Sequence, residues 1–187
     1  MSTMQTGIPA AETAERYAID PAHTTVEFVV RHLMITRVRG RFAGVSGGFV
    51  LPKGTTVPQE LDVTIDAASV DTREAQRDAH LRSPDFLDAE RFPAMTYRST
   101  RVEGAPEAFR VYGELTLHGV TREVVLEAEF EGQGGDPWGG KRVGYSAHGS
   151  INRKDVGLTW NQALEAGGVV VGDEVRIELN VQAKLEA

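Results

Sequence analysis

The 187-residue sequence contains no cysteine. Disulfide bonds, cysteine nucleophiles, iron–sulfur clusters and thiolate-bound zinc are therefore excluded. Long apolar runs are also lacking, because no stretch approaches the roughly 20 apolar residues of a membrane-spanning helix. Basic residues are in the minority: 27 Asp and Glu against 20 Lys and Arg leave a net charge of −7. This balance argues against a nucleic-acid partner and against adsorption of the whole molecule to anionic membranes, and we expect no stable membrane insertion.

Motifs for metal or nucleophilic chemistry are lacking too. The sequence has no His-x-His or His-Glu-x-x-His spacing, no Gly-x-Ser-x-Gly elbow and no Walker-type phosphate loop. Its first 16 residues have neither the basic nor the apolar region of a secretory signal peptide. We interpret residues 1–16 as a flexible lead-in, residues 17–187 as the folded domain, and the protein as cytoplasmic.

What the sequence does contain is a repeated alternation of apolar and polar residues. In the final segment, Val175, Ile177 and Leu179 alternate with Arg176 and Glu178. A period of two is typical of a β-strand with one face in an apolar interior and the other in water. The pattern predicts strands near residues 24–33, 37–45, 48–51, 60–67, 94–99, 110–118, 123–131, 143–151 and 175–185. Such a series favours an antiparallel meander closed into a barrel of about eight strands, with a two-sheet sandwich as the alternative.

One segment interrupts the strand pattern. Asp71 is followed three residues later by Glu74, which is the spacing of a helix capping box. The spacing predicts a helix over residues 73–82 that ends before Ser83-Pro84. Because the segment has few apolar residues, we expect the helix to lie over an end of the barrel and not in its core.

The inward faces combine large side chains with small ones such as Gly40, Gly113 and Ala147. Small and large residues can interlock in a solid core, or they can leave a void that an apolar ligand fills. Only one histidine, His32, shares an apolar face, where it is either a hydrogen-bonded core residue or a polar contact for a ligand. The residues alone leave these alternatives open.

Several motifs also occur in order along the chain. They are Ile19-Asp20-Pro21-Ala22-His23, Arg31-His32-Leu33, Arg77 through Phe86, Phe92-Pro93, Gly113 through Arg122, Asn152-Arg153-Lys154-Asp155 and Val171 through Val175. With these motifs the sequence resembles the YceI-like family of lipocalin-like, polyisoprenoid-binding proteins. The resemblance covers nearly the whole chain, from about Tyr17 to Glu186. The family usually has Phe at the positions of Leu87 and Val156, so smaller groups here are expected to reshape the pocket.

The resemblance implies a mainly β fold, an extended eight-stranded antiparallel lipocalin-like β-barrel with one helical insertion, formed by residues 17–187. It also implies a homodimer whose barrels bind a long isoprenoid or another long-chain amphiphile. We therefore expect non-enzymatic binding, transport or storage of a polyprenyl phosphate or quinone-like lipid, with no catalytic residue, metal or cofactor. Two alternatives stay open: an enzyme that acts on such a lipid with His32 as acid or base, and a dimeric stress or structural protein with a solid barrel.

The expected ligand contacts divide into two groups. Contacts with the lipid tail are expected from Phe28, Val30, Phe42, Val63, Phe86, Phe92, Met95, Leu115, Leu117 and Trp160. Candidates near a polar head are His32, Asn152, Arg153 and Asp155. For Arg153 and Asp155, a mutual ion pair at the surface is the alternative.

Overall fold

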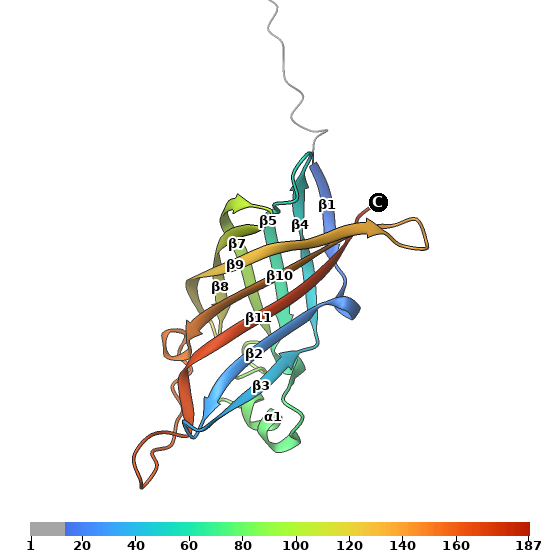
Figure 1. Ribbon diagram of the computed structural model, residues 1–187. Helices are drawn as coiled ribbons and strands as arrows, with labels where there is room; N and C mark the ends of the chain where they lie inside the picture. Colours follow the sequence, from blue (N-terminus) through green and yellow to red (C-terminus); the bar gives the residue numbers. More distant parts are fainter. Residues whose placement is uncertain (1–13) are drawn as a thin grey trace, which may run out of the picture.

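Antiparallel pairing links all eleven strands of the computed structural model, which describes residues 14–187 (Figure 1). The strands are β1 (Ala14–Ile19), β2 (Thr25–His32), β3 (Thr36–Phe42), β4 (Val45–Pro52), β5 (Gln59–Asp66), β6 (Val70–Asp71), β7 (Ala94–Ala105), β8 (Ala108–Leu117), β9 (Val120–Gly135), β10 (Lys141–Asn152) and β11 (Val171–Leu185). The helix α1 spans Ala75–Arg82, and the short 3-10 helices η1, η2 and η3 span Pro21–His23, Ala67–Ser69 and Arg153–Val156.

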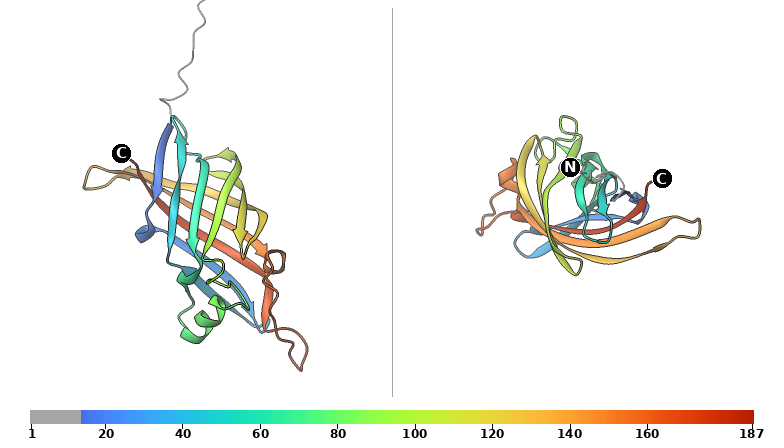
Figure 2. Two further views of the ribbon diagram at one scale, coloured as in Figure 1. Left: turned by 180° about the vertical axis from the view of Figure 1, so that it is seen from behind. Right: turned by 90° about the horizontal axis from the view of Figure 1, so that it is seen from above.

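The barrel closes with eight strand positions, two of which are each occupied by two consecutive strands. Strand β1 pairs with the C-terminal end of β11, and β2 pairs with the preceding part of the same strand. On their other edges, β1 pairs with β4 and β2 pairs with β3. The ladder then continues through β5, β7, β8, β9 and β10 back to β11 (Figure 2). The predicted eight-stranded antiparallel barrel is confirmed, and the two-sheet sandwich alternative is wrong.

The first strand begins earlier than the sequence pattern indicated. Residues 14–16, expected in a flexible lead-in, pair with Pro52, Leu51 and Val50 of β4. Ala-Glu-Arg carries no alternation that could reveal a strand, because its order comes from the neighbouring strand and not from an apolar face of its own. The rest of the expected lead-in, residues 1–13, lies outside the described residues.

The helix is capped differently from the expected capping box. Asp71 lies in β6 opposite Arg41, and its carboxylate accepts a hydrogen bond from the backbone N–H of Arg73. Glu74 is the N-cap instead, and its carboxylate accepts from the N–H groups of Gln76 and Arg77. The helix contacts β6, which pairs with the end of β3, and it lies at the lower end of the barrel (Figure 1), as expected for an element over an end of the barrel. No helix within residues 14–187 is long and apolar enough to cross a membrane.

The upper half of the barrel, the half that contains β1, is solidly packed. Tyr17 is 0% exposed and stacks on Phe49 at 5.7 Å, while Tyr145 makes edge contacts with Phe49, Phe109 and Phe130 at 5.5–6.0 Å. The other buried members of this cluster are Leu51, Val57, Tyr97, Val111, Val124, Leu126, Val143 and Ala183. Because these aromatic rings pack against one another across the barrel, little room is left for a ligand in this half.

The buried tyrosines predict a loss of stability at alkaline pH. Burial raises the pKa of both Tyr97 and Tyr145. Above the usual tyrosine pKa of about 10, the unfolded chain releases phenol protons that the folded state retains. The unfolded state then binds fewer protons, so the free energy of unfolding stays level below pH ~10 and falls above it, by up to ~2.7 kcal/mol per pH unit for two tyrosines. Urea unfolding at stepped pH measures this slope.

The variant Y97F/Y145F is the control for that prediction. The Tyr97 hydroxyl donates to the carbonyls of Val111 and Val124, so the double variant is less stable overall. Its slope above pH ~10 should nevertheless be flatter than that of the natural protein, because the two titrating groups are gone. An unchanged slope would contradict the prediction.

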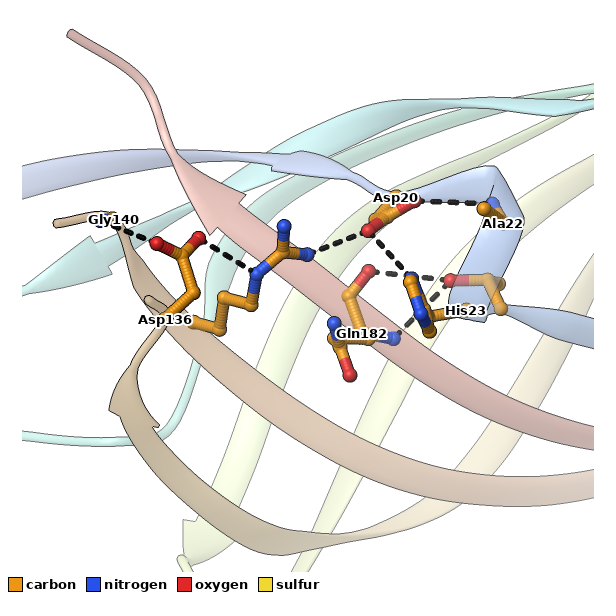
Figure 3. A network of polar contacts seen from close by, with 8 residues as sticks. Asp20, Ala22, His23, Asp136, Gly140 and Gln182 are labelled. Carbon is orange, nitrogen blue, oxygen red and sulfur yellow. Dashed lines mark hydrogen bonds and ion pairs between the residues drawn. The ribbon is translucent and has the colours of Figure 1, made fainter. Parts of the chain in front are cut away.

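A polar network holds the tip of the β9–β10 hairpin against η1 (Figure 3). Arg142 donates to Asp20 at 2.6 Å and to Asp136 at 3.0 Å, and Asp136 also accepts from the N–H of Gly140 at 2.7 Å. Hydrogen bonds from His23 and Arg142 lower the pKa of Asp20, and the Gly140 N–H lowers the pKa of Asp136. None of these residues borders the cavity described below, so the network is a structural clasp.

Candidate ligand-binding site

The lower half of the barrel, beside α1, is hollow. A cavity of about 470 Å³ lies between the inward faces of β2, β3, β5, β7, β8 and β11, the helix α1 and the segment that follows η3. We call it the lower cavity. Small-molecule sites in proteins commonly have about 300–1,000 Å³, so this volume suits a ligand of that class.

The chemistry of the wall explains both the void and its character. Along the strands the wall is mainly aliphatic, for example Val30, Val38, Ile65, Leu115 and Ile177. These side chains reach less far across a barrel than the rings of the upper half. The wall offers dispersion contacts and no polar groups over most of its area, which suits an apolar chain.

Three ring side chains gather at the mouth of the lower cavity. Trp160 lies 4.7 Å from the ring of His80 and 5.2 Å from that of Phe86, and His80 and Phe86 lie 5.0 Å apart. Nε2 of His80 is 2.8 Å from a carboxylate oxygen of Asp85. The mouth is thereby formed by α1 and its following loop on one side and by the Trp160 segment on the other.

The end of β2 supplies a polar group to the same region. His32 borders the lower cavity, and within residues 14–187 its ring makes no hydrogen bond or ion pair with a protein group. A partially exposed imidazole with free nitrogens can donate to or accept from a ligand head. Within the described residues, the cavity included, no group of three or more His, Asp or Glu side chains comes together as a metal site would require.

Comparison with known proteins now identifies the family. The sequence model of the YceI-like domain matches residues 17–183. The chain belongs to the YceI-like family. Protein YceI of Salmonella newport is 43% identical over 148 residues, which cover 78% of this chain and 78% of that protein.

Solved structures show the same YceI-like architecture. The crystal structure of a Campylobacter jejuni YceI protein superposes with a TM-score of 0.73 and 31% identity, covering 84% of this chain and 90% of that one. A polyisoprenoid-binding domain from Saccharophagus degradans has a TM-score of 0.63 and 17% identity, covering 91% of this chain and 98% of that one. At 17% identity, the similarity to the Saccharophagus degradans domain shows a shared fold only.

Most of the residues that the sequence singled out come together in this YceI-like barrel. Ten of them border the lower cavity: Phe28, Val30, His32, Phe42, Phe86, Met95, Leu115, Leu117, Arg153 and Trp160. They come from four strands, from η3 and from two loops, so the fold assembles one site from positions far apart in the sequence.

The other four do not border the lower cavity. Val63 faces inward on β5 but packs against the solid upper cluster. Phe92 lies under the β8–β9 turn, 5.0 Å from the ring of His118. Asn152 caps η3 by accepting from the N–H of Lys154, and Asp155 is exposed. The sequence patterns correctly indicated that these residues lie on an inward face or in a turn, but the residues do not line this cavity.

Arg153 borders the cavity, but its hydrogen bonds go to the backbone. Its guanidinium is directed to the backbone carbonyls of Gly172, Leu158, Trp160 and Val171. Burial lowers the pKa of Arg153. The alternative of a mutual ion pair with Asp155 is wrong, because the carboxylate near Arg153 belongs to Asp173, at 3.6 Å. Arg153 therefore has a structural role at the mouth.

Sequence reasoning missed part of the wall. Val26, Val38, Ile65, Val175 and Ile177 lie on the inward faces that alternation had identified, so counting along each strand could have found them. Residues on α1 and its neighbours gave no such signal. These are Glu74, Gln76, Arg77, His80, Leu81 and Leu158, whereas Leu87, which the family resemblance had pointed to, does border the cavity and Val156 does not.

Proposed function

We propose that this YceI-like barrel binds an amphiphilic isoprenoid lipid, a polyprenyl phosphate or a quinone, and transports or stores it without chemical change. One observation carries the proposal: the lower cavity is walled mainly by apolar side chains, while polar residues at its border such as Arg31, Glu74 and Gln76 are exposed. Each methylene moved from water into such a wall gains about 0.8 kcal/mol, so a tail needs no polar recognition. The Saccharophagus degradans domain of the same fold is described as polyisoprenoid-binding, which agrees with a lipid-binding role.

The contacts divide between tail and head as follows. The tail lies against Phe28, Val30, Phe42, Phe86, Met95, Leu115, Leu117 and Trp160. His32 at the end of β2 meets the head, because its imidazole borders the lower cavity and has no protein partner within the described residues. The hollow lower half counts against a solid structural barrel. No specific contact of His32 with a carboxylate favours it as a catalytic acid or base.

Mass spectrometry of an organic extract tests the proposal. The natively folded protein is purified and extracted beside an unrelated protein from the same host. We expect a polyprenyl or quinone species near one equivalent per chain in the first extract only. The protein is then incubated with mixed isoprenoids and quinones and extracted again. An extract that stays blank after incubation would contradict the proposal.

Two further expectations concern the protein as a whole. A homodimer, which the family resemblance implies, and a cytoplasmic location stay predictions. Light scattering of the purified protein measures the first, and fractionation of the source cells measures the second.

A further inference from the structure

Large apolar side chains are exposed at few places on the described surface. Within residues 14–187 they are Met34, at 50% exposure, Ile35, at 79%, and Trp138, at 83%. Met34 and Ile35 are adjacent in the turn between β2 and β3. That turn lies at the lower end of the barrel (Figure 1) and directly follows His32, which borders the lower cavity.

The conformation of this turn is costly for its residues. Leu33 has φ 52° and Met34 has φ 59°, the left-handed region that glycine and asparagine favour. The turn would be more stable with glycine or asparagine at positions 33 and 34. Strained backbone retained at an exposed position points to a function for the side chains it displays.

Unpartnered positive charge surrounds the same turn. Arg31 and Arg37 lie directly opposite each other across β2 and β3, an arrangement that destabilises a sheet. Within residues 14–187, three arginine side chains form neither an ion pair nor a hydrogen bond: Arg31, Arg37 and Arg73. Arg73 precedes Glu74, which borders the lower cavity. Arg31 and Arg37 thus place two free arginines beside the turn, whereas Arg73 lies at the other end of β3, where Asp71 pairs with Arg41.

The nearby carboxylates are engaged by other cations. Glu27 and Glu178 pair with Arg39, and Asp173 pairs with Lys154 at 3.1 Å. The adjoining loop, residues 161–170, has a single charged residue, Glu165. The net charge of −7 disfavours adsorption of the molecule as a whole, but the sign is reversed locally at this turn.

The turn is continuous with the cavity wall. The N–H of Leu33 donates to the carbonyl of Val170 at 2.8 Å, and both Arg31 and Val170 border the lower cavity. A surface that contacted Met34 and Ile35 would therefore also lie at the cavity mouth.

We propose that the docking tip, defined as Arg31, Leu33, Met34, Ile35 and Arg37, seats the cavity mouth on an anionic lipid bilayer. Apolar side chains inserted between lipid heads and arginines on anionic phosphates are the chemistry of a peripheral membrane contact. A symmetric contact between two copies would instead bring the Arg31–Arg37 pairs toward each other. The inference rests on the proposed function, because a carrier collects its lipid from a bilayer.

Vesicle flotation with matched variants tests the docking tip. The probe is a two-to-one mixture of phosphatidylcholine and phosphatidylglycerol, compared with phosphatidylcholine alone. Removing two arginines in R31Q/R37Q should weaken binding to the anionic vesicles about 30-fold at low salt. M34S/I35S should weaken it at least about tenfold by the lost apolar burial. Binding of the natural protein should fall as salt rises, because ions screen the phosphates.

Two controls change the same chemistry elsewhere. W138S removes the exposed apolar residue of the β9–β10 hairpin, and R101Q/R110Q removes two arginines from β7 and β8. Both should bind vesicles as the natural protein does. Equal binding by all variants, or no binding by the natural protein, would overturn the proposal.

Two companion measurements distinguish membrane docking from dimerisation through the tip and from lipid carriage. If M34S/I35S converts a dimer to a monomer in light scattering, a second copy covers the tip and the membrane proposal fails. Extracts of each variant are analysed for lipid in parallel. Vesicle binding without any bound lipid would sustain the docking tip and sink the carrier function, whereas bound lipid without vesicle binding would do the reverse.

Discussion

Replacing Arg153 with methionine is expected to lower the free energy of unfolding by several kcal/mol, about 1–3 kcal/mol for each buried carbonyl left without a donor. Arg153 is 2% exposed, and its Nε lies 2.8 Å from the carbonyl oxygen of Gly172. One terminal nitrogen bonds the carbonyls of Leu158 and Trp160 at 2.6 and 2.8 Å, and the other bonds that of Val171 at 3.3 Å. Methionine fills similar space but donates nothing, so buried carbonyls lose their partners. Urea unfolding, read as a shift in midpoint at constant slope, measures the loss.

Two other variants show what the guanidinium contributes. Lysine at position 153 keeps the charge but lacks the planar guanidinium that bonds four carbonyls. The free energy of unfolding of R153K should therefore lie between those of the natural protein and R153M. The neighbouring Lys154 is exposed and pairs with Asp173 at 3.1 Å, so K154M should cost no more than about 1 kcal/mol. A loss below ~1 kcal/mol in R153M would contradict the structural role of Arg153.

The strand pattern predicted the architecture because it depends on local periodicity. Ile177 faces inward and Arg176 outward on β11, as alternation required. The pattern missed β1 and the two-residue β6, which pair with β4 and β3. Their residues become strands because a neighbouring edge is available, and no apolar alternation of their own reveals this. Short strands held by partners cannot be recognised from the residues of one segment at a time.

Whether the barrel is solid or hollow could not be predicted in the same way. Inward positions alternate identically in both halves. Tyr145 on β10 closes the upper half by meeting Phe49, Phe109 and Phe130 from three other strands. The free volume depends on which side chains meet across the barrel. Their combined volume can be compared with the available space only once the register of all strands is known.

The polar motif after β10 was the least predictable part of the site. Asn152, Arg153 and Asp155 were expected near a ligand head as members of a motif that carries the family resemblance. In the structure Asn152 caps η3 and Arg153 binds backbone carbonyls. Turns leave backbone groups that must find partners, and nearby polar side chains commonly supply them. A polar motif at a strand end is therefore expected to serve the backbone first and a ligand second.

Tryptophan at position 177 is expected to lower the affinity for an isoprenoid probe at least about 30-fold. Ile177 lies on the inward face of β11, between Phe28 and Gly149 on the flanking strands, and borders the lower cavity. A larger ring there occupies space that a tail would fill, and displacing two or three methylenes costs about 2 kcal/mol. Titration with a dansyl-labelled farnesyl probe measures the affinity. Because the ring enters an existing void, stability should change by less than the roughly 1–3 kcal/mol typical of overpacking a solid core.

The residue before Ile177 provides the matched control, since the strand turns it to the other face. Arg176 is exposed and its partner is Glu174 at 3.7 Å, so R176W adds the same ring outside the barrel and should leave probe affinity within about twofold. If I177W folds poorly, V175F adds a smaller ring to the same wall and should weaken binding to a lesser degree. Equal affinities for the inward and outward variants would show that the probe binds elsewhere. The lower cavity would then be a packing void, and the structural-barrel alternative would gain.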